Sequence, residues 1–127
     1  MGTSLPDRLS ELAIITTARF WRAQYECFAH TPLAEKAGVP AAAVEAIRRG
    51  EAPSFVQKDE ALVHRICTEL FKTQRLSDAS FAEAVASLGK TGLIEVIGIV
   101  GYYTLIGNTL NVFQVAVPDG VSPPFPE

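Results

Sequence analysis

Cysteine and histidine are both scarce in this chain, which carries two of each among its 127 residues. Cys27 and Cys67 lie far apart and form no CxxC pair, so we expect no disulfide framework and a reducing, cytoplasmic setting. His30 and His64 are also well separated, and no His or Cys group has the spacing of zinc ligands, so no metal is expected. Walker, GxGxxG and GxSxG motifs are missing too, which gives no reason to expect a cofactor.

Positive charge is neither abundant nor clustered in the sequence. The formal net charge is −3, and the pair Arg48 and Arg49 is too short to form a basic face. This pair fits the last turn of a helix, where cations face the negative end of the helix dipole. Nucleic-acid binding normally requires a basic face, so we expect no nucleic-acid partner.

Strand patterns are almost absent, whereas helical spacing of apolar residues recurs along the chain. We therefore expect one all-α domain over residues 1–127, with about five to six helices. Pro6 marks the start of the first helix, which is expected to run without a clear break through residues 8–30. Pro32 has no backbone N–H to donate, so we expect a kink or a new helix capped by Thr31 at this point.

Glycine and proline mark several other boundaries. Gly38 is expected to end the helix before it, and Pro40 to open a short helix over residues 41–49. Gly50 then stops this short helix. Residues 118–127 contain four prolines, which predicts an extended tail that is neither helix nor central strand.

Two further helices are expected in the second half of the chain. Residues 59–73 form an amphipathic pattern, with Cys67 in the apolar stripe and His64 off the stripe, in solvent. Either Ser77 or Ser80 is expected to cap the helix that follows.

Residues 93–113 are apolar and long enough to span a bilayer. They include Glu95, Asn108 and Asn111, and no Lys or Arg follows them, which disfavours a membrane span. We therefore expect no membrane partner, and a helix buried in a protein core or in a core plus a subunit interface. A monomer of this size seldom buries such a helix completely, so a homo-oligomer is expected. Close approach of a neighbouring helix is expected at three glycines, Gly98, Gly101 and Gly107.

A carboxylate and an imidazole lie four residues apart in a stretch that is expected to be one helix. Glu26 and His30 therefore share a helix face. A carboxylate partner orients a histidine and shifts its pKa, which suits proton transfer. Trp21, Tyr25 and Phe28 interleave with the pair and are expected to give it an apolar wall. The alternative is a contact that only supports the helix.

Several stretches resemble, in their order and spacing, the carboxymuconolactone decarboxylase and AhpD-like alkylhydroperoxidase superfamily. They are residues 5–14, Gln24-Tyr25-Glu26 followed by His30-x3-Ala34-x3-Gly38, residues 101–105, and Leu110-Asn111. The resemblance covers roughly residues 4–117. It implies an AhpD-like helical bundle that assembles as trimers or hexamers, with a site near His30 at subunit contacts. Relatives carry further N-terminal helices, which this chain is expected to lack.

The peroxidase branch of this superfamily carries C-x-x-C-x3-H at the corresponding place. Alignment on His30 puts Ala23 and Glu26 at the two cysteine positions, so the resemblance implies acid–base chemistry in place of a redox dithiol. It implies a cofactor-free, decarboxylase-like lyase that acts on a carboxylated lactone or a related small acid. Glu26 and His30 would be its catalytic residues. The expected substrate-binding residues are Trp21, Arg22, Tyr25, Tyr102, Tyr103 and Asn111.

Arg22 is expected either to hold a substrate carboxylate or to pair with Glu26 along the helix. The tyrosines are expected to donate hydrogen bonds to an enolate or carbonyl oxygen. Two other functions stay open. An AhpD-like, thiol-dependent peroxidase activity through Cys27 requires an exposed thiol with a lowered pKa. A non-catalytic assembly or binding subunit requires that no cavity lie beside His30.

Overall fold

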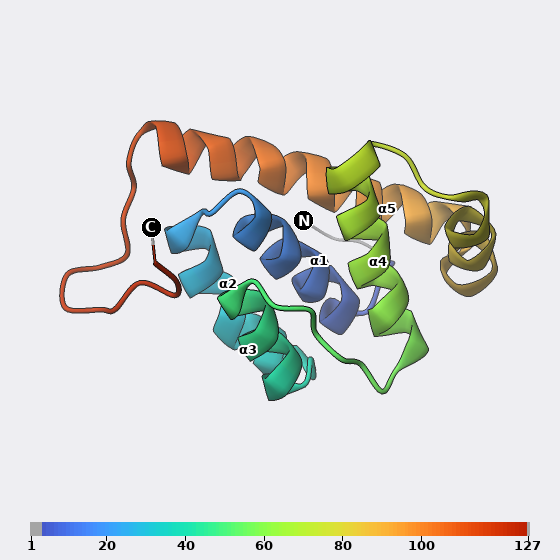
Figure 1. Ribbon diagram of the computed structural model, residues 1–127, viewed down its shortest axis with the longest axis horizontal. Coiled ribbons are helices and arrows are strands. Elements are labelled where there is room, and N and C mark those ends of the chain that lie inside the picture. The colour runs from blue at the N-terminus through green and yellow to red at the C-terminus, as the bar shows by residue number, and fades with distance from the viewer. Residues whose placement is uncertain (1–3, 127) are drawn as a thin grey trace.

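The computed structural model describes residues 4–126, and within this range it contains five α-helices and no strand. The all-α prediction is confirmed, and the number of helices lies within the expected range. Figure 1 shows how the helices are arranged. Their bounds are α1 Asp7–Phe20, α2 Gln24–Ala37, α3 Ala41–Arg49, α4 Lys58–Thr73 and α5 Asp78–Val112.

Helix α1 is the centre of the fold and contacts each of the other four helices (Figure 1). Every residue from Leu12 to Ala18 is buried, so this helix is covered on all sides. Leu12 and Ile15 are at most 1% exposed, and each such burial contributes about 1.5–3 kcal/mol. Arg8 also ties α1 to α4, because its guanidinium donates to both carboxylate oxygens of Asp59 at 3.0 and 2.8 Å.

Several boundaries lie where the sequence predicts them. Pro6 precedes α1, and its carbonyl accepts the first hydrogen bonds of that helix. Gly38 ends α2 in the left-handed conformation, with φ 109°, and Gly50 ends α3 with φ 75°. Both conformations favour glycine, because it has no Cβ to collide with the backbone. Helix α3 lies directly between Pro40 and Gly50, as expected.

The expected continuous helix through residues 8–30 is wrong, because the chain breaks between α1 and α2. Arg22 has φ 57°, a left-handed conformation that a non-glycine residue adopts only at a cost of about 1–2 kcal/mol. The N–H of Ala23 donates to the carbonyl of Ala18 at 2.9 Å and closes the end of α1. Helix α5 lies against this break, because Asn111 donates to the Trp21 carbonyl at 2.6 Å and Gly107 lies beside Trp21 and Ala23.

The new helix expected at Pro32, with Thr31 as its cap, is wrong, because α2 runs through Pro32 to Ala37. Thr31 is consequently a residue of the helix interior and not an N-cap. Pro32 removes only the one hydrogen bond that its missing N–H would make to the turn before it. Ala34 on the next turn is fully buried, so packing of the second half of α2 keeps the helix intact.

Helix α5 begins at Ser77, whose side chain accepts a hydrogen bond from the N–H of Ser80 at 3.1 Å. Ser77, and not Ser80, is therefore the cap. Gly89 interrupts the helix with φ 72° and ψ 166°, which produces a kink. Gly92 does not interrupt it. After the kink the long second part of α5 extends along the whole molecule, beside α1 (Figure 1).

Burial of this second part of α5 is one-sided in the single chain. Ile94 and Leu105 are 67% and 62% exposed, so complete burial of the apolar run inside one chain is wrong. Of the three glycines, Gly107 has close neighbours, whereas a Cβ added at Gly98 or Gly101 would meet nothing within 4 Å. By length and composition α5 is the one helix in residues 4–126 that could cross a membrane, and 33% of its apolar window is buried.

The chain after α5 forms a tail without helix or strand, as the prolines predict. After α5 the tail turns back and lies beside α2 (Figure 1). Phe125 is only 3% exposed and packs with Ala18 and Cys27. The side-chain N–H of Gln24 donates to the Phe125 carbonyl at 2.6 Å, and the Arg19 guanidinium lies 4.4 Å from the centre of the Phe125 ring.

Candidate active site

His30 lies between two carboxylates that come from two different helices. Its Nδ1 atom lies 2.8 Å from Oε2 of Glu11 on α1. Its Nε2 atom lies 3.2 Å from Oε1 of Glu26, one turn earlier on α2. The predicted contact between Glu26 and His30 is therefore present, and a second acidic partner completes a Glu11–His30–Glu26 triad.

The triad is largely removed from solvent. The side chains of His30, Glu11 and Glu26 are 16%, 18% and 10% exposed. Burial tends to lower the pKa of His30, but the hydrogen bond and charge of Glu11, with the charge of Glu26, outweigh it and raise that pKa. Since both ring nitrogens donate in an imidazolium, the two carboxylates favour this form.

Glu11 was not found by sequence reasoning. It precedes His30 by nineteen residues and lies on another helix, so helix spacing cannot relate the two. The position of Glu11 in the sequence gives one hint. Glu11 directly precedes Leu12, which is fully buried. A carboxylate at the edge of an apolar helix face is seldom buried without a partner. The partner itself follows only from the packing of α1 against α2.

The aromatic neighbour of His30 comes from α5 and not from its own helix. The ring of Tyr103 meets the imidazole edge-on, with 5.4 Å between ring centres. Burial, and next the charges of Glu26 and Glu11, raise the pKa of Tyr103, so its hydroxyl keeps its proton. Tyr102 packs edge-on against Tyr103 at 5.2 Å and is 48% exposed.

The expected wall of Trp21, Tyr25 and Phe28 does not form around His30. Tyr25 pairs with Phe28, with 6.2 Å between ring centres, and is 38% exposed. The indole N–H of Trp21 donates to the Thr104 hydroxyl at 2.9 Å. None of these three rings has a ring contact with His30 among residues 4–126.

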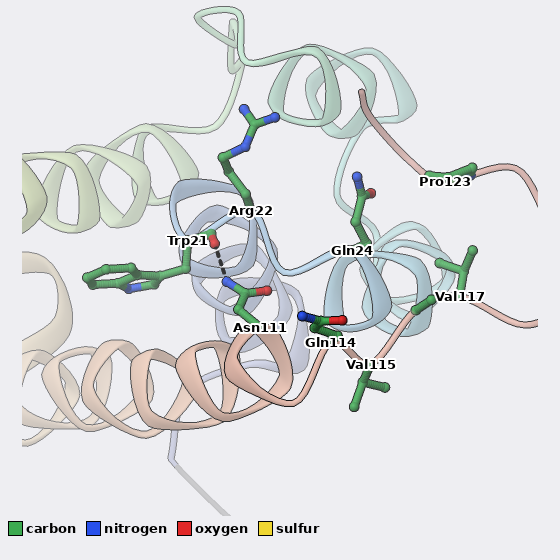
Figure 2. A pocket seen from close by; sticks show the side chains of 9 residues that line it. Trp21, Arg22, Gln24, Asn111, Gln114, Val115, Val117 and Pro123 are labelled. Carbon is green, nitrogen blue, oxygen red and sulfur yellow. Dashed lines mark hydrogen bonds between the residues drawn. The ribbon is translucent and has the colours of Figure 1, made fainter. Parts of the chain in front are cut away.

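Trp21, Arg22 and Asn111 instead border a separate hollow of about 380 Å³, between the end of α5 and the tail (Figure 2). The side-chain N–H of Asn111 donates to the Trp21 carbonyl at 2.6 Å. Arg22 donates to the Pro126 carbonyl at 2.7 Å, so the alternative of an ion pair with Glu26 is wrong. The structure thus places Tyr103 next to the triad, Tyr102 behind it, and the other predicted binding residues elsewhere.

Cys27 has neither property that thiol chemistry requires. Its side chain is buried, with 1% exposure. Burial raises the pKa of the thiol, although the nearby hydroxyl of Thr31, 3.8 Å from the sulfur, acts in the opposite direction. Cys67 is fully buried in the main core, where burial raises its pKa to about 12.

The hollow that touches the triad lies beside Glu11. It measures about 330 Å³ and is bordered by Glu11 and Asp7 of α1 and by Leu33 and Lys36 of α2. Within residues 4–126, no group of three or more His, Cys, Asp or Glu side chains is arranged to hold a metal ion. The carboxylates, the imidazole and the phenol at this site are groups that can transfer protons.

Fold and site together define an all-helical protein with a buried carboxylate–imidazole–carboxylate triad. No protein-family model, curated protein or solved structure matches this chain. Its function consequently has to be inferred from the triad and its surroundings.

Proposed function

We propose that this protein is a cofactor-free acid–base enzyme of the carboxymuconolactone decarboxylase-like, AhpD-like type. It would act as a lyase on a carboxylated lactone or a related small acid, with Glu26 and His30 as catalytic residues. The observation that supports this proposal is the Glu11–His30–Glu26 triad, in which an imidazole lies 2.8 and 3.2 Å from two carboxylates and is largely shielded from bulk water.

Each member of the triad has a distinct task in this proposal. Glu11 binds Nδ1 and fixes the orientation of the ring, so that Nε2 faces Glu26. Loss of CO2 breaks the carbon–carboxylate bond and leaves the electron pair on the substrate as an enolate. His30 passes the proton on Nε2 to Glu26, Glu26 delivers it to that carbon, and solvent then restores the proton of His30. Tyr103, which keeps its phenolic proton, donates a hydrogen bond to the enolate oxygen.

The negative charge of the triad limits how a substrate can bind. A substrate carboxylate would be repelled by Glu11 and Glu26 unless a cation lies beside it. Lys36 provides a cation in the hollow beside Glu11, whereas Arg22 is bound to the tail. We therefore assign to Lys36 the role of carboxylate holder that the sequence suggested for Arg22.

The first test is to measure CO2 release from carboxymuconolactone by the wild type and by two variants, Glu26→Gln and His30→Gln. General acid–base groups contribute about 10²–10⁴-fold to rates, so each variant should lower kcat/KM by a factor in this range. Glu35→Gln is the matched control, because Glu35 is an exposed carboxylate on the same helix. Circular dichroism should show unchanged helix content in all three variants.

The outcome that would overturn the proposal is turnover that stays the same in both triad variants. A wild type without turnover of carboxymuconolactone or other small carboxylated lactones would count against the lyase assignment itself. In that case the triad has a structural role, because it links α1 to α2 through a largely buried contact. This second function, an assembly or binding subunit, requires that His30→Gln lower the unfolding temperature while no enzymatic activity is lost.

We further propose that the protein works as a homo-oligomer, trimer or hexamer, in the cytoplasm. The support is the exposed face of α5, where residues 96–112 include no charged side chain. Apolar residues and glycines recur on this face at intervals of three or four, and they are Ile94, Gly98, Gly101 and Leu105. Two copies of such a face can pack without burying a charge. Both cysteines are free, which agrees with a reducing compartment.

A further inference from the structure

A second hollow lies between α1, α4 and the loop after α3, away from the triad. It measures about 400 Å³, which is within the range of small-molecule sites. Helices α1 and α4 contribute most of the side chains that carry its chemistry, and these are Arg19, Phe20, His64, Thr68, Phe71 and Lys72. Glu11, by contrast, borders the hollow beside the triad, so the two sites use different parts of α1.

One stripe of α4 presents three polar side chains to this hollow. His64, Thr68 and Lys72 follow one another at intervals of four residues, and all three border it. His64 is half-buried, not solvated as the sequence suggested, and burial lowers its pKa, so the ring is neutral at pH 7. Among residues 4–126, the ring nitrogens of His64 and the Lys72 ammonium have no hydrogen-bond or ion-pair partner. The imidazole lies beside the ring of Phe55, with 5.7 Å between ring centres.

Another part of the lining is aromatic. Phe20 and Phe71 are stacked almost parallel, at 5°, with 4.0 Å between ring centres. Phe20 is nevertheless 47% exposed, so part of this apolar surface is open to a ligand. A planar ring can extend such a stack, and an aromatic pair contributes about 0.5–1.5 kcal/mol beyond the area it buries.

The charged side chains that border the hollow determine which polar group a ligand needs in order to bind there. Lys72 and Arg19 are cations and Glu51 is the one carboxylate among the lining residues. Arg19 is already engaged, since its Nε donates to the Arg48 carbonyl at 3.0 Å and its guanidinium covers Phe125. Lys72 is therefore the cation available to a ligand.

We propose that this hollow is a binding site for a small aromatic carboxylate, whose ring stacks on the Phe20–Phe71 pair while its carboxylate faces Lys72 and its edge contacts His64. The site is independent of the triad, and its existence does not depend on the enzymatic activity proposed above.

Benzoate is the probe that tests this site, and the chain provides its own reporters. It contains only two histidines, His30 at the triad and His64 at the hollow, so their imidazole C–H resonances can be assigned by NMR. Titration with benzoate at pH 7.5 should shift the His64 resonances with saturation. Benzyl alcohol, which has the ring without the charge, and acetate, which has the charge without the ring, should each bind more weakly.

Two variants locate the response at this hollow. Lys72→Gln removes the proposed contact and should raise the Kd for benzoate about threefold, the effect of one partly exposed ion pair. Lys90→Gln, which removes an exposed lysine of α5, is the control and should leave the Kd unchanged. Ala52→Trp places a large side chain in the loop that borders the hollow and should abolish the His64 shift.

The proposal is overturned if the His64 resonances do not saturate with benzoate. It is also overturned if they saturate with the same Kd in the wild type and in Lys72→Gln, or if Ala52→Trp leaves the shift unchanged. A benzoate response of His30 alone assigns the aromatic carboxylate to the triad and removes the second site.

Discussion

At the scale of single residues, the two histidines of this chain are opposite cases. His30 has a carboxylate at each ring nitrogen, and their effects raise its pKa in spite of burial. His64 has no charged partner among residues 4–126, and burial alone lowers its pKa. Two side chains of the same kind in one small fold therefore have pKa values that their surroundings shift in opposite directions.

The Glu11→Gln variant tests the contribution of the carboxylate that the sequence did not reveal. Glutamine keeps the size of the side chain but removes its charge, so the pKa of His30 should fall, measured by NMR titration of the imidazole. The His64 resonances should titrate as in the wild type, since Glu11 does not border that hollow. Glu35→Gln is the matched control. An unchanged titration of His30 would show that Glu11 does not stabilise the imidazolium in solution.

The same variant has a second readout in the pH dependence of stability. Because the folded-state pKa of His30 is above its ordinary value of 6.5, its stabilising effect is complete below about pH 6.5. It is lost as the pH rises through the folded-state pKa. His64 has the opposite sign, and its effect is lost as the pH falls from 6.5 through its lowered pKa. In Glu11→Gln, urea unfolding should therefore show less loss of stability above pH 6.5 than in the wild type.

Residue patterns predicted one of the two contacts in the triad. An interval of four residues on one helix was enough to place Glu26 against His30. It could not provide Glu11 or Tyr103, because these come from α1 and α5 and approach His30 only through packing between helices. The sequence also suggested Trp21, Arg22 and Asn111 for this site. They border a different hollow, because the packing of helices, and not closeness in sequence, decides which residues meet.

At the scale of elements, the boundaries that the sequence predicted are those with local causes. Gly38, Pro40 and Gly50 act through their own backbone geometry, so their positions decided where α2 and α3 end or begin. The break at Arg22 has no such residue. It depends on contacts with Gly107 and Asn111 of α5, more than eighty residues later. Pro32 is the opposite case. Its missing N–H predicts an interruption of the helix, but α2 continues and the residues after Pro32 pack into the core.

The tail is attached through the buried ring of Phe125 and through hydrogen bonds from Arg22 and Gln24 to its carbonyls, and the share of Phe125 can be tested through the cysteines. Phe125 packs against Ala18 and Cys27, whereas Cys67 lies in the main core. Phe125→Ala should release the tail and increase the rate at which a thiol reagent labels Cys27 in the native protein. Labelling of Cys67 should stay slow, which makes it an internal control in the same mass spectrum.

Phe125→Ala should have a limited effect on the five helices. Replacing a buried phenylalanine by alanine costs about 3–5 kcal/mol in a core, but the tail can detach without unfolding the helices. Val121→Ala, on the exposed part of the tail, is the matched control and should leave the labelling of Cys27 unchanged. Equal labelling rates for Cys27 in the wild type and in Phe125→Ala would contradict the role assigned to the tail.

At the scale of the whole molecule, the main feature is that one side of α5 is left uncovered by the other described residues, 4–126. Its inner side carries Tyr103 and Gly107, which face the triad and the break between α1 and α2. Its outer side exposes Ile94 and Leu105, while Gly98 and Gly101 have open space above them. The same helix thus connects the candidate site to the surface through which we propose that the chain associates.

Association through this outer side predicts a specific response to a charge. Light scattering coupled to size-exclusion chromatography should give the wild type a mass of three or six times the 13.7 kDa of one chain. Leu105→Glu should reduce this mass toward that of one chain, because a carboxylate buried in an apolar interface is strongly unfavourable. Leu105 is 62% exposed in the single chain, so helix content should not change.

Val56→Glu is the control for this substitution, since Val56 is 96% exposed in the loop before α4 and lies off this surface. Its mass should equal that of the wild type. Tyr102 is exposed beside the outer side of α5 and packs on Tyr103, so a partner would cover it and shield the triad further. Leu105→Glu should therefore lower turnover as well as mass. A wild type of 13.7 kDa, or a Leu105→Glu variant with unchanged mass, would show that this side of α5 is not where copies of the chain meet.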